Sequence, residues 1–378
     1  MTSSKTSEIY VGLMSGTSLD GVDVAIVDFS SFPPRLLYSD TSPYEVSVRE
    51  RLLELCQQQT TSLDSLYSLH AELGEIYADT VIRALAESGL SRDRIAAIGC
   101  HGQTIRHGPE ATFPYTAQIG DANRIAVRTA ITTVADFRGK DIALGGQAAP
   151  LAPAFHRFLF RSDDEDRAVI NIGGIANITC LPADAEQKVL GFDTGPGNTL
   201  MDVWCQQHQG KAYDASGDWA RQGAVDGSLL RKMLSSEPYF SLPPPKSTGT
   251  EYFNPDWLRQ QVDNASEAAN IQATLAELTA ATIADAIEAL PIEVSSCFVC
   301  GGGAHNEYLL ERLQLKLGER QLETTEALGL NPDFVEACAF AWLARERVNL
   351  RPGNLPEVTR ASKPSVLGAI YAADEDDH

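Results

Sequence analysis

The 378-residue sequence lacks the features of several classes of protein. No apolar run approaches the roughly 18 residues that a membrane-spanning helix needs, and the first residues lack the regions of a signal peptide. Positive charge is scarce: 30 Lys and Arg stand against 51 Asp and Glu, a net charge of −21. That field disfavours nucleic acid and membranes as partners. These absences predict a cytoplasmic protein in which local groups must hold any phosphate ligand.

The common nucleotide-binding motifs are also missing. No GxxxxGK[ST] sequence occurs, because Lys140 and Lys211 follow glycines without the required hydroxyl residue and spacing. No GxGxxG opens a predicted helix, which disfavours a Rossmann domain, and no protein-kinase motif set is present. A phosphate ligand would have to be bound by another arrangement.

The seven cysteines form no disulfide framework, since most occur singly along the chain. The one CxxC, Cys297 to Cys300, has no second pair that would complete a zinc site. It lies in "SSCFVCGGG", which is typical of a buried strand. We interpret these cysteines as core residues rather than a metal or redox site.

Strands that alternate with helices predict an α/β architecture. Expected strands cover 8–14, 22–29, 35–40, 95–100, 131–137, 167–181, 188–193 and 297–300, and expected helices cover 46–58, 62–88, 198–209, 335–344, 363–373 and much of 254–290.

The pattern restarts in the middle of the chain. "YVGLMSGTSLDGVDVAIVDF" and "VINIGGIANITCLP" share an order of apolar strand, glycine-rich turn and apolar strand. This similarity predicts two related domains that open toward a shared cleft. We expect an N-terminal lobe over 1–134, joined by 355–378, and a C-terminal lobe over 135–354.

Three glycine turns follow predicted strands, at 15–21, 173–174 and 301–303. Glycine allows a backbone to approach a ligand closely and to adopt positive φ, and such turns can direct several N–H groups at a phosphate. A plain hairpin would explain the first turn equally well. Three turns in two domains favour a nucleotide.

Several segments together resemble one known family along nearly the whole chain. They are "GLMSGTSLDGVDVAIVDF", "HGQTIRH", "VADFRGKDIALGGQAAPL", "NIGGIANIT", "GFDTGPGNTLMD", "PKSTG", "VCGGGAHN" and "VEACAFAWLA". In this order they are similar to the anhydro-N-acetylmuramic acid kinases, within the superfamily of sugar kinases, actin and heat-shock chaperones.

The resemblance implies a two-lobed α/β protein with a duplicated ribonuclease-H-like (actin-like ATPase) fold and a nucleotide cleft between the lobes. The resemblance also implies a cytoplasmic enzyme of cell-wall recycling. It uses ATP, Mg²⁺ and water to convert 1,6-anhydro-N-acetylmuramic acid into N-acetylmuramic acid 6-phosphate. A homodimer is one possible assembly, and the resemblance leaves the magnesium ligands unnamed.

The resemblance and the residue patterns together predict site residues. Asp193 is the catalytic base. The ATP-binding set is Ser15, Gly16, Thr17, Ser18, Leu19, Asp20, Gly21, Val22, Asp23, Gly173, Gly174, Gly301, Gly302 and Gly303. The sugar-binding set is His101, Gln103, Arg138, Gly195 and Glu336.

The residues themselves leave alternatives for these roles. A carboxylate at a strand end suits general-base work, but Asp193 could instead cap the helix from Asn198 or support its turn. Glu336 is either a second carboxylate at the sugar or a solvated acid at a helix start. Arg138 would pair with the lactyl carboxylate of the sugar or with Asp141.

Further polar residues follow predicted strands. His101 and Gln103 come after a buried strand and so either reach the cleft or pack in the core. Asp121 precedes a helix and is expected to be its N-cap.

Some positions depart from what the resemblance implies. The superfamily usually has acidic residues where this chain has Met14 and Asn171. The family itself would have glycine at Ala148 and Arg360 and arginine at Thr250. Three rival functions stay open: a kinase of another anhydro sugar such as levoglucosan, an actin-like or chaperone-like ATPase, and a nucleotide-binding module without catalysis.

Overall fold

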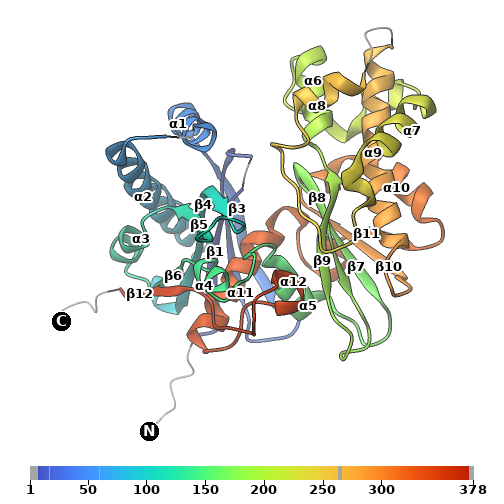
Figure 1. The fold of residues 1–378 in the computed structure, drawn as a ribbon. Coiled ribbons are helices and arrows are strands. Elements are labelled where there is room, and N and C mark those ends of the chain that lie inside the picture. Colours follow the sequence, from blue (N-terminus) through green and yellow to red (C-terminus); the bar gives the residue numbers. More distant parts are fainter. Residues whose placement is uncertain (1–6, 17, 59, 263–265, 374–378) are drawn as a thin grey trace, which may run out of the picture. The chain divides into compact units, whose positions relative to one another are not determined.

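The computed structural model describes residues 7–16, 18–58, 60–262 and 266–373, and they divide into two compact units. Unit 1 comprises the chain up to Phe155 and from Phe334 onward, and unit 2 comprises His156–Asp333. Each unit contains one β-sheet with its own helices (Figure 1).

The sheet of unit 1 is built on an antiparallel meander, β1–β2–β3, with parallel strands beside β1. Its strand order is β12-β6-β4-β1-β2-β3, and β5 forms a hairpin with the second half of β4. The strands are β1 (Ile9–Ser15), β2 (Gly21–Asp28), β3 (Arg35–Pro43), β4 (Ile95–Gly108), β5 (Tyr115–Ile119), β6 (Thr133–Ala135) and β12 (Ala369–Tyr371).

The sheet of unit 2 repeats this plan. Its order is β11-β10-β7-β8-β9, with an antiparallel meander β7–β8–β9 and with β10 and β11 parallel to β7. The strands are β7 (Arg167–Ile172), β8 (Ile175–Leu181), β9 (Leu190–Pro196), β10 (Ser296–Cys300) and β11 (Gln321–Thr324). Apart from the β5 hairpin and β12, both sheets place their strands in the order third, second, first, fourth, fifth. The predicted duplicated α/β fold is confirmed.

Helices cover both faces of the sheet in unit 1. The helices of this unit are α1 (Val46–Gln57), α2 (Leu63–Ser88), α3 (Ala122–Thr129), α4 (Gly139–Ala143), α11 (Val335–Val348) and α12 (Pro356–Thr359). The unit boundary at Phe155 falls inside α5 (Ala152–Phe160). Side chains of α1, α2 and α3 form a core with β1, β2 and β4, in which Leu52, Leu73 and Ile125 are fully buried. Asp121 caps α3, as predicted, because its Oδ1 accepts the N–H of Asn123 at 3.0 Å.

Two paired glycines allow α11 to pack closely on the opposite face. Gly12 of β1 and Gly99 of β4 are register partners. A β-carbon on Gly12 would overlap the backbone of Ala337, and one on Gly99 would overlap that of Phe340. The small residues of α11 therefore lie directly on the sheet of unit 1.

The unit boundaries differ from the predicted ones for this reason. Residues 135–155 and 334–354 were expected in the C-terminal lobe, but they belong to unit 1 together with the end of the chain. The helix expected over 363–373 is also wrong. Gly368 has φ of 87°, which ends any helical path, and β12 follows it as a strand antiparallel to β6.

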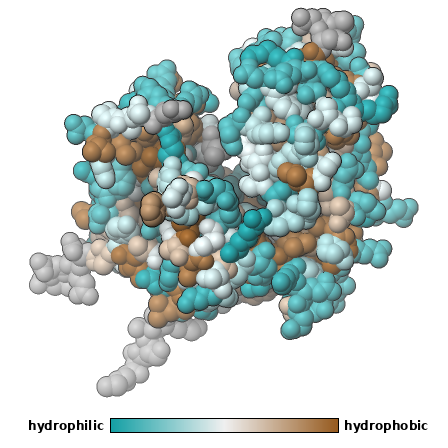
Figure 2. All heavy atoms as spheres, viewed as in Figure 1, coloured by the Kyte–Doolittle hydropathy of each residue, from teal (hydrophilic) through white to brown (hydrophobic). Residues whose placement is uncertain are grey.

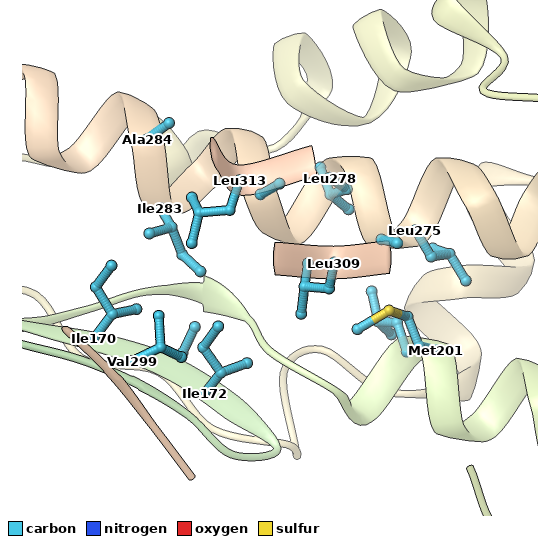
Figure 3. Close-up of a cluster of buried hydrophobic side chains, with 14 of the residues drawn as sticks. Ile170, Ile172, Met201, Leu275, Leu278, Ile283, Ala284, Val299, Leu309 and Leu313 are labelled. Atoms are coloured by element: carbon cyan, nitrogen blue, oxygen red, sulfur yellow. The ribbon is translucent and has the colours of Figure 1, made fainter. Parts of the chain in front are cut away.

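Unit 2 buries its core between its sheet and a long apolar helix, α9 (Figure 3). Ile170, Ile172 and Val299 of the sheet face Ile283 of α9 and Leu309 of α10. The helices of unit 2 are α6 (Thr199–Gln209), α7 (Gly227–Ser236), α8 (Pro255–Gln261), α9 (Ala268–Glu288) and α10 (Glu307–Leu317).

Hydrophilic residues cover much of the face shown in Figure 2, in keeping with the strong negative charge. Hydrophobic residues appear there as separate patches. Within the described ranges, no helix has the length and apolar character needed to cross a bilayer.

Two of the departures from the family pattern occur at left-handed backbone positions. Ala148 has φ of 54° and Arg360 has φ of 65°. Arg360 ends α12, where its N–H donates to Pro356 at 2.8 Å. A side chain with a β-carbon is strained in this conformation, which explains why glycine would suit both positions.

We expect Arg360→Gly to increase the free energy of unfolding. The left-handed conformation costs a non-glycine residue about 1–2 kcal/mol, and the added freedom of glycine in the unfolded chain returns about 0.4–1 kcal/mol of that. The net gain should be up to about 1 kcal/mol, measured by urea denaturation. Arg360→Ala is the control, since it removes the same side chain and keeps the strain. Equal stabilities of the two variants would contradict the explanation.

Candidate active site

The turn after β1 is tied to β4 by a buried hydrogen-bond network. The Ser15 Oγ lies 2.6 Å from Gln103 Oε1, 2.7 Å from the Tyr44 hydroxyl and 3.0 Å from the Gly21 carbonyl. The Gln103 amide donates to the Gly16 carbonyl at 3.1 Å. Ser15 is 2% exposed and Gln103 is 0% exposed. Both side chains therefore shape the turn, and Gln103, expected at the sugar, is used within the fold.

Other members of the predicted ATP-binding turn also face inward. Leu19 and Val22 are buried in the core of unit 1. A β-carbon on Gly21 would overlap the backbone of Ser42. Asp23 accepts a hydrogen bond from the Thr41 hydroxyl at 2.6 Å. A ligand could meet Leu19, Gly21 and Val22 only through their backbone, whereas Asp23 is half-buried and its hydrogen bond lies at an exposed position.

The outward-facing part of this turn is shorter. Ser18 and Asp20 are exposed, and the Ser18 hydroxyl donates to the Asp20 carboxylate at 2.8 Å. A β-carbon on Gly16 would have the Ser18 Oγ, at 3.6 Å, as its one near contact among the described residues, so their packing does not require glycine there. Thr17 lies outside the described residues.

In unit 2, the turn between β7 and β8 meets the start of α6. The N–H of Asn198 donates to the Gly173 carbonyl at 2.8 Å, and the N–H of Gly197 donates to the Gly174 carbonyl at 2.9 Å. Asn198 precedes α6 without a side-chain cap, and its amide donates instead to the Ile172 carbonyl at 3.2 Å. This turn and the N-terminus of α6 form one structure.

The third glycine run, after β10, lies beside them. Gly301 has φ of 78°, and a β-carbon on Gly303 would overlap the Ile172 side chain, so the fold requires both. Gly302 differs, because its nearest neighbour would be the Asn198 Nδ2, 3.8 Å away. Two of the three predicted glycine turns thus meet at a helix N-terminus, whose N–H groups favour an anion.

Asp193 lies within β9 and does not end the strand as expected, since β9 continues to Pro196. Its Oδ2 accepts the Ser247 hydroxyl and the Thr248 N–H, each at 2.9 Å. Burial raises the pKa of Asp193, and these two hydrogen bonds act in the opposite direction. The carboxylate does not cap α6; it fastens a neighbouring segment to the sheet.

Gly195 shares this strand. Its φ is 153°, and a β-carbon there would lie 2.8 Å from the ring of Phe240. Gly195 is therefore a packing position beside Asp193, which accounts for glycine without a direct contact to a sugar.

The remaining predicted sugar residues lie together in unit 1. His101, expected after a strand, is inside β4, where its ring lies against that of Phe340 in a tilted arrangement with centroids 4.7 Å apart. The Arg138 Nε donates to the His101 Nε2 at 3.0 Å. Burial and the Arg138 charge hold the pKa of His101 well below its ordinary value. The imidazole is therefore neutral, and its Nε2 accepts the hydrogen bond from Arg138.

Glu336 and Asp141 have different relations to Arg138. Glu336 is half-buried, and although burial raises its pKa, the nearby Arg138 charge opposes the rise. It is not the solvated acid of the alternative interpretation. The buried Asp141 instead accepts hydrogen bonds from the Ala148 N–H at 2.8 Å and the Thr359 hydroxyl at 2.8 Å. Arg138 in turn donates to the Ala148 carbonyl.

The cysteine pair behaves as core. Cys297 and Cys300 are buried on β10 outside any disulfide, and residues three apart on a strand point to opposite faces. Burial raises the pKa of Cys297 to about 12. Among the residues that the structure describes, no three His, Cys, Asp or Glu side chains are placed to hold a metal ion.

The sequence interpretation missed the residues that hold Asp193. Lys246, Ser247 and Thr248 belong to "PKSTG", a segment that carries the family resemblance but that received no role. Asp202, in the first turn of α6, was also missed. Burial and the charge of Asp214 raise the pKa of Asp202 to about 7.

Comparisons with known proteins give one family. The family model described as anhydro-N-acetylmuramic acid kinase matches residues 8–373. The anhydro-N-acetylmuramic acid kinase of Pasteurella multocida (strain Pm70) is 50% identical over 370 residues, which are 97% of this chain and 97% of that protein. That of Xanthomonas axonopodis pv. citri (strain 306) is 50% identical over 372 residues, which are 97% of this chain and 99% of that protein.

Among solved structures, the activator of the 2-hydroxyisocaproyl-CoA dehydratase from Clostridium difficile with bound ADPNP is similar with a TM-score of 0.45. The sequence identity is 13%, over 90% of this chain and 96% of that one. The full-length sequence matches are decisive: this chain belongs to the anhydro-N-acetylmuramic acid kinase family.

Proposed function

We propose that this protein is an ATP-dependent kinase that opens 1,6-anhydro-N-acetylmuramic acid with water and forms N-acetylmuramic acid 6-phosphate. The observation that carries the proposal is the match of residues 8–373 to the family, with relatives of that activity at 50% identity over almost their whole length. The reaction would serve the recycling of cell-wall peptidoglycan.

The chemistry requires one base and one phosphate-binding site. An anhydro sugar has no free 6-hydroxyl, so water must attack the anomeric carbon while the bond from that carbon to the 6-oxygen breaks. The water oxygen becomes the anomeric hydroxyl, and the 6-oxygen takes the γ-phosphoryl group as ADP leaves. The proton lost by the water goes to the carboxylate of Asp193, a half-buried residue of β9.

ATP would be held through its phosphates. The proposal assigns them to the accessible glycines and N–H groups at Gly173, Gly302 and the start of α6, because backbone donors and the helix dipole both favour anions. The turn at 15–23, whose Gly16 is open, is assigned to ATP as the family resemblance implies. Mg²⁺ would enter with the phosphates, since magnesium is often held by substrate phosphates and one or two carboxylates.

The sugar would be held by groups of unit 1. Arg138 is the residue proposed for the lactyl carboxylate, since a guanidinium suits a carboxylate and its hydrogen bonds to His101 and Ala148 go to an imidazole and a carbonyl. Glu336, beside it, would accept hydrogen bonds from sugar hydroxyls. Gln103 and Gly195 act in this proposal as supports of the site.

The cellular setting is part of the proposal. None of the seven cysteines, all of which lie in the described residues, is in a disulfide, which suits the reducing cytoplasm where ATP is available. A homodimer is proposed as an assembly that light scattering of the purified protein would test.

The function is tested with the purified protein, ATP, Mg²⁺ and a panel of anhydro sugars. We expect one ADP and one N-acetylmuramic acid 6-phosphate for each anhydro-N-acetylmuramic acid consumed, and much slower turnover of levoglucosan, which lacks the lactyl and N-acetyl groups. Preferred turnover of levoglucosan would favour the alternative sugar kinase. Release of ADP without a sugar phosphate would favour an ATPase.

A further inference from the structure

Asp193 lies on an edge strand, and the segment 239–248 covers the open side of that strand. β9 is the last strand of its sheet, so one side of its backbone has no strand partner. There the Asp193 N–H donates to the Lys246 carbonyl at 3.1 Å, and the Tyr239 hydroxyl donates to the Asp193 carbonyl at 2.8 Å. With the bonds from Ser247 and Thr248, this segment makes four hydrogen bonds to one residue.

Lys246 holds this segment in shape. Its Nζ donates to the carbonyls of Tyr239 and Phe240 at 3.1 and 3.2 Å, and it lies 4.7 Å from the centre of the Tyr239 ring. The ammonium therefore closes the loop between the two ends of the segment that contact Asp193. This side chain is directed at its own loop, which makes it a structural tie rather than a phosphate ligand.

The two hydrogen bonds that the Asp193 carboxylate accepts go to the same oxygen. Oδ2 accepts from Ser247 and from Thr248, so the base function falls to Oδ1. We propose that Ser247, held in place by Lys246, is a positioning residue whose hydroxyl acts together with the backbone N–H at position 248 to fix the Asp193 carboxylate by Oδ2 and present Oδ1 to the attacking water. This inference rests on the proposed role of Asp193 as the base.

The same contacts set the acidity of the base. A hydrogen bond to an ionised carboxylate stabilises the charged form, so the two donors oppose the rise in the pKa of Asp193 that burial causes. Removing one donor should raise the pKa of Asp193 by about one pH unit, which is the usual share of one such bond.

Ser247→Ala and Thr248→Ala form a matched pair. Ser247 donates through its side chain and Thr248 through its backbone, so only Ser247→Ala removes a donor. We expect Ser247→Ala to move the acidic limb of the pH profile of kcat/KM for the sugar up by about one pH unit, with KM for ATP unchanged. Thr248→Ala should keep the wild-type profile. Ser247 is exposed, so its variant should fold normally.

Lys246→Met tests the tie. Methionine is an unbranched side chain one heavy atom shorter than lysine, so the variant keeps most of the apolar stem and loses the charge and the hydrogen bonds of Nζ. It should lower kcat by roughly tenfold, the effect of losing about one hydrogen bond to a charged group, and raise the pKa of Asp193 less sharply than Ser247→Ala does.

A readout without turnover separates this inference from the proposed function. Titration of ¹³C-labelled aspartate by NMR, with the Asp193→Asn variant for assignment, gives the pKa of Asp193 in the full chain directly. An upward shift in Ser247→Ala and none in Thr248→Ala supports the inference even if the sugar proves to be wrong. Equal pKa values in wild type and Ser247→Ala, or equal shifts in both variants, would overturn it.

Discussion

Asp193→Asn should reduce turnover of anhydro-N-acetylmuramic acid by about 10²–10⁴-fold, the usual contribution of a positioned base, while ATP and sugar still bind. Asparagine keeps the size of the side chain and its carbonyl oxygen can still accept from Ser247 and Thr248. It cannot take the proton of the attacking water. Ring opening and phosphorylation should fall together, because one attack drives both.

The measurement combines initial rates, calorimetry and product analysis in ¹⁸O-water. Wild-type protein should place the label on the anomeric oxygen and the phosphate on the 6-oxygen. Glu251→Gln is the matched control, since Glu251 is exposed and influences Asp193 only through its charge. Loss of binding in Asp193→Asn would indicate a structural role. Label in inorganic phosphate, with the sugar intact, would show that water attacks ATP instead.

Gly302→Val should weaken ATP binding by roughly ten- to hundredfold and leave the fold intact. A β-carbon on Gly302 meets no atom closer than the Asn198 Nδ2 at 3.8 Å, so the ligand-free protein accommodates the larger side chain. A bound phosphate at the start of α6 would be crowded. Overpacking costs about 1–3 kcal/mol, and each 1.4 kcal/mol is a factor of ten in affinity.

Gly303→Val is the contrast. Its side chain would collide with Ile172 in the core, so this variant should lose stability, with a lowered melting temperature. Both variants replace glycine by valine at neighbouring positions. Comparing them separates an effect on ATP binding from an effect on folding. If calorimetry finds wild-type ATP affinity in a folded Gly302→Val protein, the phosphate assignment of this turn is wrong.

Gly16→Val repeats the test in unit 1. Among the described residues, only the Ser18 Oγ, at 3.6 Å, would lie near the added β-carbon, so the fold should tolerate the change as it does at Gly302. A comparable loss of ATP affinity is expected if the turn at 15–23 binds phosphate.

Sequence patterns predicted the fold where the pattern is local. The two apolar strand–glycine–strand repeats correspond to β1–β2 and β7–β8, and the helical periodicities correspond to α1, α2, α6 and α11. The segment 363–373 failed because an apolar run without clear periodicity fits a helix or a strand. The left-handed conformation of Gly368 interrupts a helix, and pairing with β6 makes the residues that follow it a strand.

The same division applies to the site. Glycine-rich turns are visible in the sequence, but whether each glycine serves the fold or a ligand is not. Gly303 packs on Ile172 and Gly302 does not, although they are neighbours in one run. Gln103 looked like a cleft residue and proved to hold Ser15, because hydrogen bonds between residues 88 positions apart leave no trace in a local pattern.

The sequence by itself determined the family, the α/β class and the duplication, and it led to the prediction of Asp193 as the base, because motifs and strand periodicity are properties of short segments. Tertiary structure decided which side chains act together. It placed α11 on the paired glycines of β1 and β4, joined Arg138 to His101, and laid "PKSTG" over the open edge of β9. These relations follow from close packing and from the need of buried polar groups for partners, both of which act between segments far apart in the chain.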